Sequence, residues 1–555
     1  MMDLQSGTKL TTGETLRRAA EEWPDREAIV MDGQRLTWSQ FHDRAMLMAR
    51  GLLGMGLQPG CHVGLLGPNS IDYLLLFHAI GMIGGCAVTL NARYRDEDLA
   101  YVVQYADLDA LFIGGHGLPH TDFRAMLCRV FPEIESWNGR TALKLAGAPK
   151  LKFVVNVADA REEKWPTMLH LEYAAGRLPP HCIIGLAPMI DDEQVCLMMF
   201  SSGTTANPKA CMLSHRSLAL TGAALAKRWK LTVDDRMFDP LPFFHMSTML
   251  PLAACRASGC AFISTLHFDA GEALKTYAGE RITISYASFP TMMSAIVAHP
   301  DFAGTDLSRL RLVHCVGPAD LLRRYAAAMP HVHIINAYGL TEASGVPCYS
   351  DPDDPHELSF TTNGVPFEGV EVKIIDAETG ADLPPTGRGE ICLRGYVVFK
   401  GYYKDPEGTA KVLSADGWLR TGDIGTTDGH GRIIYDGRLK DMVKVGGENV
   451  AAVEVEGFLC THPAVLLAQV IGVPDDHLLE VIAAYVELKP GMSVSADELI
   501  EYCAGRIASY KIPRYIRFVT AWPMSTTKIQ KFKLRETFTP EGKIDVRAIL
   551  KRKTG

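Results

Sequence analysis

The segment FSSGTTANPKA, residues 200–210, combines several hydroxyl side chains with a glycine and a lysine. Gly, Asn and Pro interrupt both the helical and the strand period, so we expect a loop. A loop rich in Ser, Thr and Gly can present hydroxyls and backbone N–H groups to phosphate oxygens, and a lysine adds a point charge. The segment lacks the G-x-x-x-x-G-K-[ST] spacing of a Walker loop. Taken alone, it indicates either a phosphate-binding loop or a solvated turn.

Two further segments carry groups that could bind a nucleotide. In NAYGLTEAS, residues 336–344, Tyr338 could stack on a base, and Glu342 could hold a Mg²⁺ ion that bridges phosphates. In DGWLRTGDIG, Asp423 follows a Thr-Gly pair in a predicted tight turn, where a carboxylate could accept two ribose hydroxyls. Each segment taken alone could equally be a structural turn with an acidic side chain.

The elements around these segments predict an α/β architecture. Apolar runs with strand character, such as VGLLG, ALFIGG and QVCLMMF, alternate with helical stretches such as FHDRAMLMARGLLGMG and DLLRRYAAAM. Such alternation favours largely parallel sheets. The uncharged run YLLLFHAIGMIGGCAVTL, residues 73–90, has the length of a membrane span. Its histidine and its Gly and Thr interruptions favour a buried helix followed by a buried strand.

The pattern of elements changes twice along the second half of the chain. After about residue 360, short alternating strands joined by Gly, Pro and Asp turns are typical of a small antiparallel barrel or sheet. A new helix and strand alternation then follows, with enough apolar residues for a small α+β domain. We therefore expect a large N-terminal domain over residues 1–436, a hinge over residues 437–440 and a small C-terminal domain over residues 441–555.

Composition narrows the class of protein. A chain of 555 residues should divide into two or more domains. Its net charge of −8, without a basic face interleaved with aromatics, argues against nucleic acid as the main partner. Its 13 cysteines lie singly, without a CxxC pair or zinc-ligand spacing, which suits a reducing cytoplasm. The N-terminal stretch lacks an apolar core of the export-signal kind, so we expect a cytoplasmic protein without a transmembrane segment.

In this order and at these separations, the three segments resemble those of the acyl-adenylate-forming superfamily. This superfamily contains acyl-CoA synthetases, nonribosomal adenylation domains and firefly-type luciferases. The resemblance begins at ETLRRAAEEWPDREAIV, continues through GPNSIDYLLLFHAIGMIGGCAVTLNARY and ends at KIPRYIRFV and PMSTTKIQK, so it covers nearly the whole chain. It implies an α/β fold in which a large N-terminal domain of stacked α/β sheets with a small β-barrel precedes a small mobile α+β domain.

The resemblance implies a set of ATP-binding residues: Ser201, Ser202, Gly203, Thr204, Thr205, Lys209, Gly317, Tyr338, Gly339, Thr341, Asp423 and Arg438. Thr204 and Thr205 would donate to the triphosphate. Ala206 and Ala210 stand where the family usually has glycine. Alanine fits these positions where φ is negative, and elsewhere it costs stability or loop mobility.

The adenosine contacts follow from the same resemblance. Tyr338 would stack on the adenine, and Asp423 with Arg438 would hold the ribose. The segment VGPAD stands where the family has a Gly-Gly-Ala-Pro-like adenine contact, but its Pro and Ala occur in reversed order. Only Gly317 is therefore assigned to the adenine contact in this segment.

The catalytic groups implied by the resemblance are Glu342, Lys528, Thr204 and His245. Glu342 would bind Mg²⁺, with Thr341 near the α-phosphate. Lys528 in STTKIQK matches the adenylation lysine, whose ammonium can bridge the substrate carboxylate and the α-phosphate. The residue before this lysine is Thr527 instead of the family's usual glycine, and a β-branched residue stiffens that turn.

Other positions concern the second substrate and the domain movement. In LPFFHMS, His245 occupies the position that the family uses as an aromatic gate between the acyl pocket and the pantetheine channel. A histidine that simply lines the core is the alternative. Lys440 would be the hinge pivot, and Gly446, Gly447 and Glu448 resemble the loop that lets the CoA arm pass.

Together these roles imply an AMP-forming carboxylic acid:CoA ligase. The acid would attack the α-phosphorus of ATP·Mg²⁺, pyrophosphate would leave, and the small domain would rotate so that the CoA thiol attacks the acyl carbon. The candidate acyl-pocket segments FFHMSTML, YASFPTMM and GVPCYS are apolar and rich in Met, without Arg or Lys. We therefore expect an apolar acid, with aryl, alicyclic and aliphatic acids all left open.

Other functions within and outside this class stay open. Amino-acid-activating domains usually carry an Asp in an FDxS-type segment, whereas FDPLPFFHMS leads into the Pro-Phe-Phe-His pattern of acyl- and aryl-CoA synthetases. Luciferase-type oxygenation is not excluded by motif. The changes at Ala206, Ala210 and Thr527 favour a nucleotide-binding or sensor protein without turnover, and an adenylating enzyme with a non-CoA acceptor is a further alternative. The sequence leaves homo-oligomers and peripheral membrane contact open.

Overall fold

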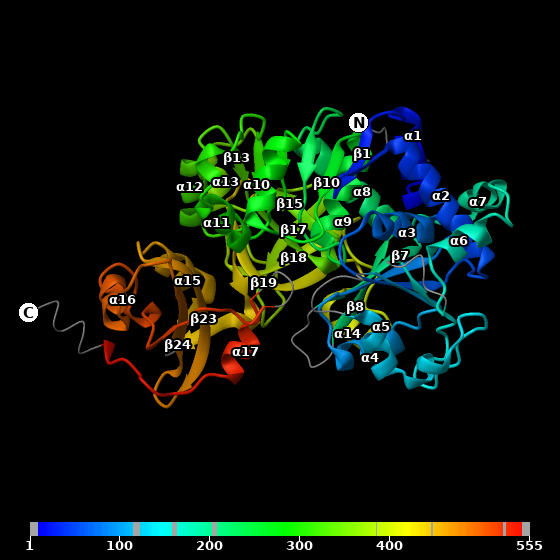
Figure 1. Cartoon of the computed structure of the whole chain (residues 1–555). Helices are drawn as coiled ribbons and strands as arrows, with labels where there is room; N and C mark the ends of the chain where they lie inside the picture. Colours follow the sequence, from blue (N-terminus) through cyan, green and yellow to red (C-terminus); the bar gives the residue numbers. More distant parts are fainter. Residues whose placement is uncertain are drawn as a thin grey trace, which may run out of the picture.

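The computed structural model describes residues 9–114, 122–157, 164–201, 208–384, 386–445, 448–524 and 529–546. Figure 1 shows a large domain, coloured blue to yellow, and a smaller orange and red domain beside it. Within the described ranges, no helix is both long and apolar enough to cross a membrane. The run at residues 73–90 forms a buried helix and a buried strand, as predicted.

The first large sheet has the strand order β13-β12-β11-β9-β10-β1-β2 and is parallel except for the pair β1 and β2. Its strands are β1 (Glu27–Met31), β2 (Gln34–Thr37), β9 (Arg236–Phe238), β10 (Ala261–Ser264), β11 (Ile284–Ser285), β12 (Leu312–His314) and β13 (His333–Ile335). Because the parallel strands share a direction, the residues that follow β9, β11 and β12 meet at one edge, where ligands bind in open α/β sheets.

The second large sheet has the order β6-β5-β3-β4-β7-β8 and is parallel except for the pair β7 and β8. Its strands are β3 (His62–Leu66), β4 (Cys86–Leu90), β5 (Ala110–Ile113), β6 (Phe153–Asn156), β7 (Val195–Ser201) and β8 (Lys209–Ser214). One buried apolar cluster contains side chains of both large sheets, such as Phe112 and Phe262. The two sheets therefore belong to one folded unit.

Helices cover and separate the two large sheets. They are α1 (Thr12–Glu22), α2 (Trp38–Gly54), α3 (Ile71–Met82), α4 (Asp96–Tyr105), α5 (Phe123–Val130), α6 (Met168–Ala175), α7 (His181–Leu186), α8 (His215–Arg228), α9 (Met246–Ser258), α10 (Ala270–Gly279), α11 (Pro290–Ala298), α12 (Ala319–Ala328), α13 (His356–Thr361) and α14 (Pro406–Val412). The Ser70 hydroxyl caps α3 by accepting a hydrogen bond from the backbone N–H of Tyr73 at 3.1 Å. Almost every side chain of α3 is buried, so this helix is held by packing on all sides.

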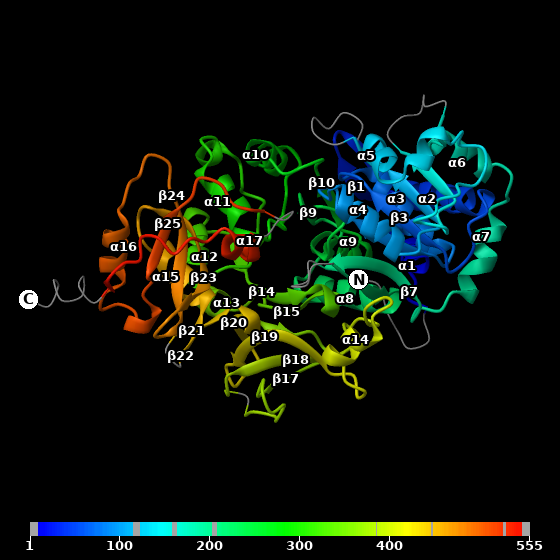
Figure 2. The same cartoon turned by 90° about the horizontal axis from the view of Figure 1, so that it is seen from below.

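Two antiparallel sheets complete the large domain. One contains β14 (Ala337–Leu340), β15 (Gly345–Tyr349) and β16 (Val365–Pro366), and the other contains β17 (Val370–Ile375), β18 (Gly389–Gly395), β19 (Leu419–Thr427) and β20 (Ile433–Arg438). The second of these is the small β-structure expected after residue 360. Figure 2 shows its yellow strands below the large sheets, leading into the small domain. The chain also forms 3₁₀ turns η1 (Pro132–Ser136), η2 (Ala187–Met189), η3 (Phe302–Gly304), η4 (Thr341–Ala343), η5 (Leu439–Asp441) and η6 (Ser509–Lys511).

The small domain is α+β. It contains β21 (Met442–Val445), β22 (Glu448–Ala451), β23 (Val465–Asp475), β24 (Leu479–Leu488) and β25 (Tyr515–Phe518), with α15 (Ala452–Cys460), α16 (Ala496–Cys503) and α17 (Lys531–Glu536). Its buried apolar residues, drawn from positions 443–546, form clusters that include no buried residue of the large domain. Each domain thus has its own core.

Candidate active site

Residues 421–423, within strand β19, are held in place by hydrogen bonds to β18 and to one another. Gly422 adopts a left-handed backbone, with φ of 70°. Its N–H donates to Glu390 Oε1 at 2.9 Å, and the Thr421 hydroxyl donates to the carbonyl oxygen of Ile391 at 2.6 Å. The N–H of Asp423 then donates to the Thr421 hydroxyl oxygen at 3.1 Å. The predicted tight turn is not found: residues 421–423 lie within strand β19, beside a register shift in its pairing with β18, and this kinked segment directs the Asp423 carboxylate to one place.

Asp423 meets two other predicted site residues. The Tyr338 hydroxyl donates to Asp423 Oδ2 at 2.8 Å, and Arg438 Nε lies 3.3 Å from Asp423 Oδ1. The Asp423 side chain is 3% exposed, whereas that of Arg438 is 42% exposed. Asp423 and Arg438 are also paired residues of β19 and β20. The three residues assigned to adenosine therefore form one contiguous group, although their ligand roles stay predictions.

The Tyr338 ring is itself buried at 4% exposure. It lies 5.7 Å from the Tyr435 ring, with an angle of 31° between the ring planes. Burial, followed by the Asp423 carboxylate, raises the pKa of Tyr338 well above its usual value. The phenol therefore stays protonated and acts as a donor. The predicted stacking of Tyr338 on adenine is not tested by this arrangement.

Glu342 lies in the turn η4, directly after the strand that carries Tyr338. The Tyr402 hydroxyl donates to Glu342 Oε1 at 2.9 Å, and the backbone N–H of Phe399 donates to the Glu342 carbonyl oxygen at 2.9 Å. Burial, followed by the Glu342 carboxylate, raises the pKa of Tyr402. Glu342 is thus held by a segment about 60 residues further along the chain.

The hydroxyl-rich segment lies at the end of a β-hairpin. Ser201 ends β7 and pairs with Lys209, the first residue of β8. The sequence predicted a loop followed by a helix and missed β8. The extended strand accepts Ala210 without strain, since its φ is negative. Ser202, Gly203, Thr204, Thr205 and Ala206 lie outside the described residues, and their predicted roles stay predictions.

Lys209 is anchored at the base of this hairpin. Its Nζ lies 3.4 Å from Asp405 Oδ2 and 4.6 Å from the centroid of the Tyr402 ring. The ring of Tyr402 therefore contacts Lys209, while its hydroxyl holds Glu342. This arrangement brings the base of the predicted phosphate loop next to the predicted Mg²⁺ carboxylate.

Sequence reasoning missed Tyr402, Asp405 and Tyr435, which position the predicted residues. The segment KGYYKD, residues 400–405, offered a weak signal because it places two aromatics beside an acid. The pairing with Glu342 and Lys209 depends on tertiary structure and leaves no periodic trace in the sequence.

His245 occupies the N-cap position of α9. Its ring is half-buried and lies 4.7 Å from the Phe244 ring. Near it, Gly345 has φ of +100°, and a Cβ there would lie 3.3 Å from Leu250 and 3.4 Å from Met246. The missing side chain lets β15 lie close to α9, on the side where the acyl-pocket segments were expected.

Two other glycines of the predicted site mark close contacts. A Cβ on Gly339 would lie 2.1 Å from the Gly345 carbonyl oxygen, so β14 and β15 can approach only with glycine at this position. A Cβ on Gly317 would lie 3.2 Å from Pro290. Directly after Gly317, Pro318 contacts the small domain, because a Cβ on Gly457 of α15 would lie 3.2 Å from it.

The residues predicted for the hinge and the CoA side are partly described. Lys440 lies in η5, between the last strand of the large domain and the first of the small one. Glu448 begins β22 and pairs with Val445, while Gly446 and Gly447 lie outside the described residues. Thr527 and Lys528 also lie outside them. The expected domain boundaries and these roles stay predictions.

Helix α17, which begins three residues after Lys528, is tied to the rest of the small domain. Lys531 Nζ lies 2.6 Å from Glu456 Oε1 in a largely buried ion pair. Arg535 Nη2 lies 2.8 Å from Asp441 Oδ1 in η5. Helix α17 therefore has charged contacts with both α15 and the turn η5 at Asp441, which directly follows the predicted hinge segment 437–440.

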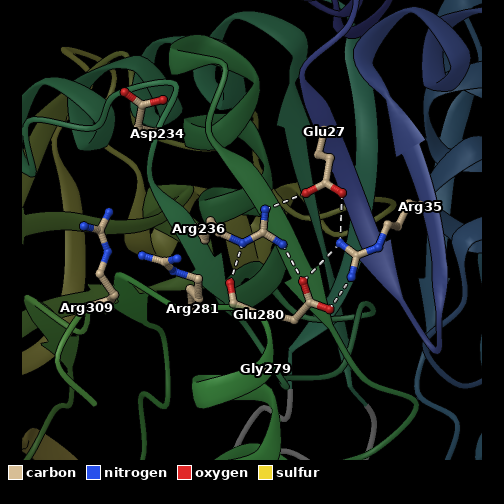
Figure 3. Close-up of a pocket in the computed structure, with 8 residues that line it drawn as sticks. All are labelled: Glu27, Arg35, Asp234, Arg236, Gly279, Glu280, Arg281 and Arg309. Carbon is tan, nitrogen blue, oxygen red and sulfur yellow. Dashed lines mark hydrogen bonds and ion pairs between the residues drawn. The ribbon is translucent and has the colours of Figure 1, made fainter. Parts of the chain in front are cut away.

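A surface cavity of about 320 Å³ lies elsewhere (Figure 3). In it, Arg236 and Arg35 are paired with Glu27 and Glu280. Glu27 and Arg236 are the first residues of β1 and β9, so the cavity lies at the amino edge of the first sheet. This is the edge opposite to the one followed by the acyl-pocket segments, and we do not assign the cavity to the acid.

Comparison with curated proteins identifies the class. The family model described as AMP-binding enzyme matches residues 16–403, and the model described as AMP-binding enzyme C-terminal domain matches residues 454–528. The chain is 38% identical over 534 residues to the putative acyl-CoA synthetase YngI of Bacillus subtilis (strain 168), covering 95% of this chain and 96% of that relative. It is 33% identical over 542 residues to the mitochondrial medium-chain acyl-CoA ligase ACSF2 of Homo sapiens, covering 95% and 87%.

Solved structures agree. The anthranilate CoA ligase AuaEII in complex with anthranoyl-AMP matches with a TM-score of 0.83 and 27% identity, covering 97% of this chain and 98% of that one. ATP-bound MatB from Rhodopseudomonas palustris matches with a TM-score of 0.82 and 25% identity, covering 97% and 100%. The resemblance and the fold class inferred from the sequence are thereby confirmed. The chain belongs to the AMP-binding enzyme family and is an AMP-forming acid:CoA ligase that uses ATP and CoA.

Proposed function

We propose that the group formed by Tyr338, Asp423 and Arg438 binds the adenosine of ATP. The observation that supports this most directly is the 2.8 Å hydrogen bond between Tyr338 and Asp423, which are 85 residues apart. Asp423 is an acceptor held in the kinked segment of β19 and can exchange its contacts for ribose hydroxyls. Arg438, as the exposed member, neutralises the carboxylate when the ribose is absent.

Mg²⁺ fits the residues around Glu342. In proteins this ion is usually held by one or two carboxylates, with phosphates and water completing its shell. Glu342 offers a half-buried carboxylate that is oriented by Tyr402 and lies beside the base of the phosphate loop. The ion would neutralise charge on the phosphates, while Glu342 sets its position and Lys209 adds a positive charge.

Lys528 would act in the first half-reaction only. Its ammonium would bridge the acid carboxylate and the α-phosphate while pyrophosphate leaves. The ion pairs of Lys531 and Arg535 connect the following helix to α15 and to η5. Movement at Lys440 would therefore carry α17 and Lys528 with the small domain, and would bring Gly446, Gly447 and Glu448 to the acyl-AMP for attack by the CoA thiol.

The acid is proposed to be of medium length and mainly apolar. The human relative is named a medium-chain acyl-CoA ligase. In this chain Gly345 packs against the apolar side chains of Met246 and Leu250, and methionine adapts to different apolar shapes. A cytoplasmic location is proposed from the singly placed cysteines, which suit a reducing compartment.

Turnover with a series of acids tests this function. The full chain is incubated with ATP, MgCl₂, CoA and short, medium and long straight-chain acids or aryl acids. AMP is measured by chromatography and acyl-CoA by mass spectrometry. We expect acid-dependent AMP and acyl-CoA in equal amounts, with the highest kcat/KM for a medium-length acid. AMP without a thioester would indicate another acceptor, and ATP binding without AMP for every acid would contradict the ligase assignment.

A further inference from the structure

Four aromatic side chains form one buried group, which we call the distal cluster: Trp229, Tyr286, His314 and Tyr349. Each is at most 1% exposed. The Tyr286 and His314 rings lie 4.5 Å apart, and the Trp229 and Tyr349 rings 5.1 Å apart. The hydroxyls of Tyr286 and Tyr349 form a 2.6 Å hydrogen bond with each other. The cluster thus consists of aromatic rings, but these rings carry several polar atoms.

Two of these polar atoms, and a carboxyl oxygen nearby, have no hydrogen-bond partner among the described residues. They are Trp229 Nε1, His314 Nδ1 and Asp239 Oδ2. Asp239 is completely buried and close enough to Tyr286 and Tyr349 to interact with both electrostatically. Burial raises the pKa of its carboxyl well above the usual value, which favours the neutral form. A buried polar atom without a partner costs about 1–3 kcal/mol. Three such atoms in one place indicate that something polar belongs there.

The cluster lies at the carboxyl edge of the first sheet, the edge where ligands bind in such folds. Asp239 directly follows β9, Tyr286 directly follows β11, and His314 ends β12. The loops after β9 and β11 carry candidate acyl-pocket segments, and the loop after β12 carries Gly317, the predicted adenine contact. The cavity in Figure 3 lies at the opposite edge of the same sheet.

Backbone contacts connect the cluster to the predicted site. The N–H of Ser288 donates to the Tyr286 carbonyl oxygen at 2.9 Å, and the N–H of Val316 donates to the Ser288 carbonyl oxygen at 3.0 Å. Val316 precedes Gly317, the predicted adenine contact. The cluster is therefore attached to the same loops that would border the acyl-AMP.

Strand β15 connects the predicted acyl site at Gly345 to the distal cluster at Tyr349, and its length gives the distance between them. Gly345 and Tyr349 are four residues apart on this strand, which places them about 13 Å apart. At one end of the strand, Gly345 lies against Met246 and Leu250 of α9. At the other end, the Tyr349 ring lies 5.1 Å from the Trp229 ring of the cluster. An acid activated beside Gly345 would direct its far end toward the cluster.

We propose that the distal cluster recognises a hydroxyl group at the far end of an otherwise apolar acid. A purely apolar tail would leave Trp229 Nε1 and His314 Nδ1 unpaired. A hydroxyl satisfies both, because it accepts from the indole N–H and donates to the imidazole nitrogen. Burial lowers the pKa of His314 to about 3, so this imidazole is neutral and can accept. The inference rests on the ligase function and specifies its substrate class.

Matched pairs of acids test the proposal. Each pair consists of a medium-chain acid and the same acid with a hydroxyl near its far end, and kcat/KM is measured for both. We expect the wild type to prefer the hydroxylated acid by about tenfold or more, since a site built to bond a hydroxyl rejects the analogue without it. In His314→Phe and in Tyr286→Phe the preference should fall toward one.

Tyr277→Phe is the control variant. Tyr277 is a buried tyrosine whose hydroxyl bonds Ser285 Oγ at 2.7 Å, and it lies outside the cluster. The Tyr277→Phe variant should keep the wild-type preference for the hydroxylated acid. Equal or better turnover of the plain acid by the wild type would overturn the proposal, as would equal losses for both acids in both cluster variants; the polar atoms would then be assigned to buried water.

Melting temperatures separate this inference from the ligase function. They are recorded with ATP and each acid of a pair. If no acid is turned over, the ligase function fails, and a larger increase of the melting temperature with the hydroxylated acid would still support the cluster as its binding site. Equal shifts with both acids would reject the cluster as well.

Discussion

Tyr338 and Asp423 are joined by a 2.8 Å hydrogen bond inside the large domain, with Arg438 on the other oxygen of the carboxylate. This relationship links the strand before Glu342 to β19, an inner strand of the small antiparallel sheet. The Asp423 carboxylate would have to release at least part of this arrangement to accept ribose hydroxyls. Nucleotide binding is therefore expected to depend on both members of the pair, but not equally.

We expect Asp423→Ala to raise KM for ATP by about tenfold or more, because it removes the only acceptor proposed for the ribose and leaves Arg438 without its carboxylate. Tyr338→Phe keeps the ring and removes one hydrogen bond, so its KM should rise by only a few-fold. Pyrophosphate exchange at varied ATP concentrations gives the KM for ATP of each variant. A stronger effect in Tyr338→Phe than in Asp423→Ala would contradict the assignment of Asp423 to the ribose.

Glu342→Gln should increase the Mg²⁺ concentration needed for half-maximal adenylation by about tenfold, because a neutral amide is a poorer ligand for a hard cation than a carboxylate. Tyr402→Phe is the matched control: it removes the hydroxyl that orients Glu342 and should increase the requirement by less. Activity is measured over a series of MgCl₂ concentrations at fixed ATP. An unchanged Mg²⁺ requirement in Glu342→Gln would exclude this residue as the ligand.

Lys528→Ala should slow acyl-AMP formation by about a hundredfold or more, while CoA transfer from supplied acyl-AMP continues. Lys533→Ala, an exposed lysine of α17, is the control and should change neither step. The two half-reactions are measured separately by pyrophosphate exchange and by thioester formation. Equal losses in both half-reactions would show that Lys528 is not confined to the first.

Gly457→Val tests the contact between the domains. A Cβ at this position would lie 3.2 Å from Pro318, and the branched side chain would push α15 away. We expect the ratio of the two half-reaction rates to change by about tenfold, with Gly457→Ala giving an intermediate value. The melting temperature should not fall, because both residues favour helix more than glycine does. An unchanged ratio would show that this contact has no part in the domain movement.

An ion pair between the buried Asp235 carboxylate and the partly exposed Arg311 makes a pH-dependent contribution to stability. Asp235 accepts hydrogen bonds from Arg311 at 3.0 Å and from the Thr283 hydroxyl at 2.7 Å. Burial tends to raise the pKa of Asp235, but the contacts with Arg311 and Thr283 outweigh it and lower the pKa. Since the folded pKa is depressed, the contribution is complete above about pH 3.9, the usual Asp pKa, and is lost as the pH falls below that value.

Asp235→Asn should therefore lower the free energy of unfolding by roughly 1–3 kcal/mol at pH 7. The difference from the wild type should shrink as the pH falls below about 3.9. Urea unfolding of the wild type and the variant, at pH 7 and at a pH below about 3.9, measures this difference in the free energy of unfolding. A difference that is the same at neutral and acid pH would show that the effect comes from packing and not from the charge.

Much of the fold followed from patterns within single segments. The run at residues 73–90 was identified as a helix and a strand, because its length and interruptions are local features. The motifs around Glu342 and Asp423 were also recognisable, since each is a compact local segment; Glu342 lies in a turn as expected, whereas Asp423 lies within strand β19. Strand β8 was missed because its first residues belong to a segment rich in turn formers, and only pairing with β7 makes them a strand.

The contacts that complete the site could not be read in this way. Tyr402 reaches Glu342 from about 60 residues away, and no periodicity connects them. The distal cluster is assembled from four segments that look like ordinary core in the sequence. Its distinguishing property, buried polar atoms without partners, exists only once Trp229 and His314 lie side by side.

The separate cores of the two domains have a consequence for heat denaturation. Because the buried clusters at positions 443–546 include no side chain of the large domain, each domain can melt as its own cooperative unit. Calorimetry would then show two endotherms in place of one. ATP would raise the transition of the large domain, which carries Tyr338 and Asp423, more than that of the small one. A loss of activity on mild heating could thus begin with the small domain while the nucleotide site is still intact.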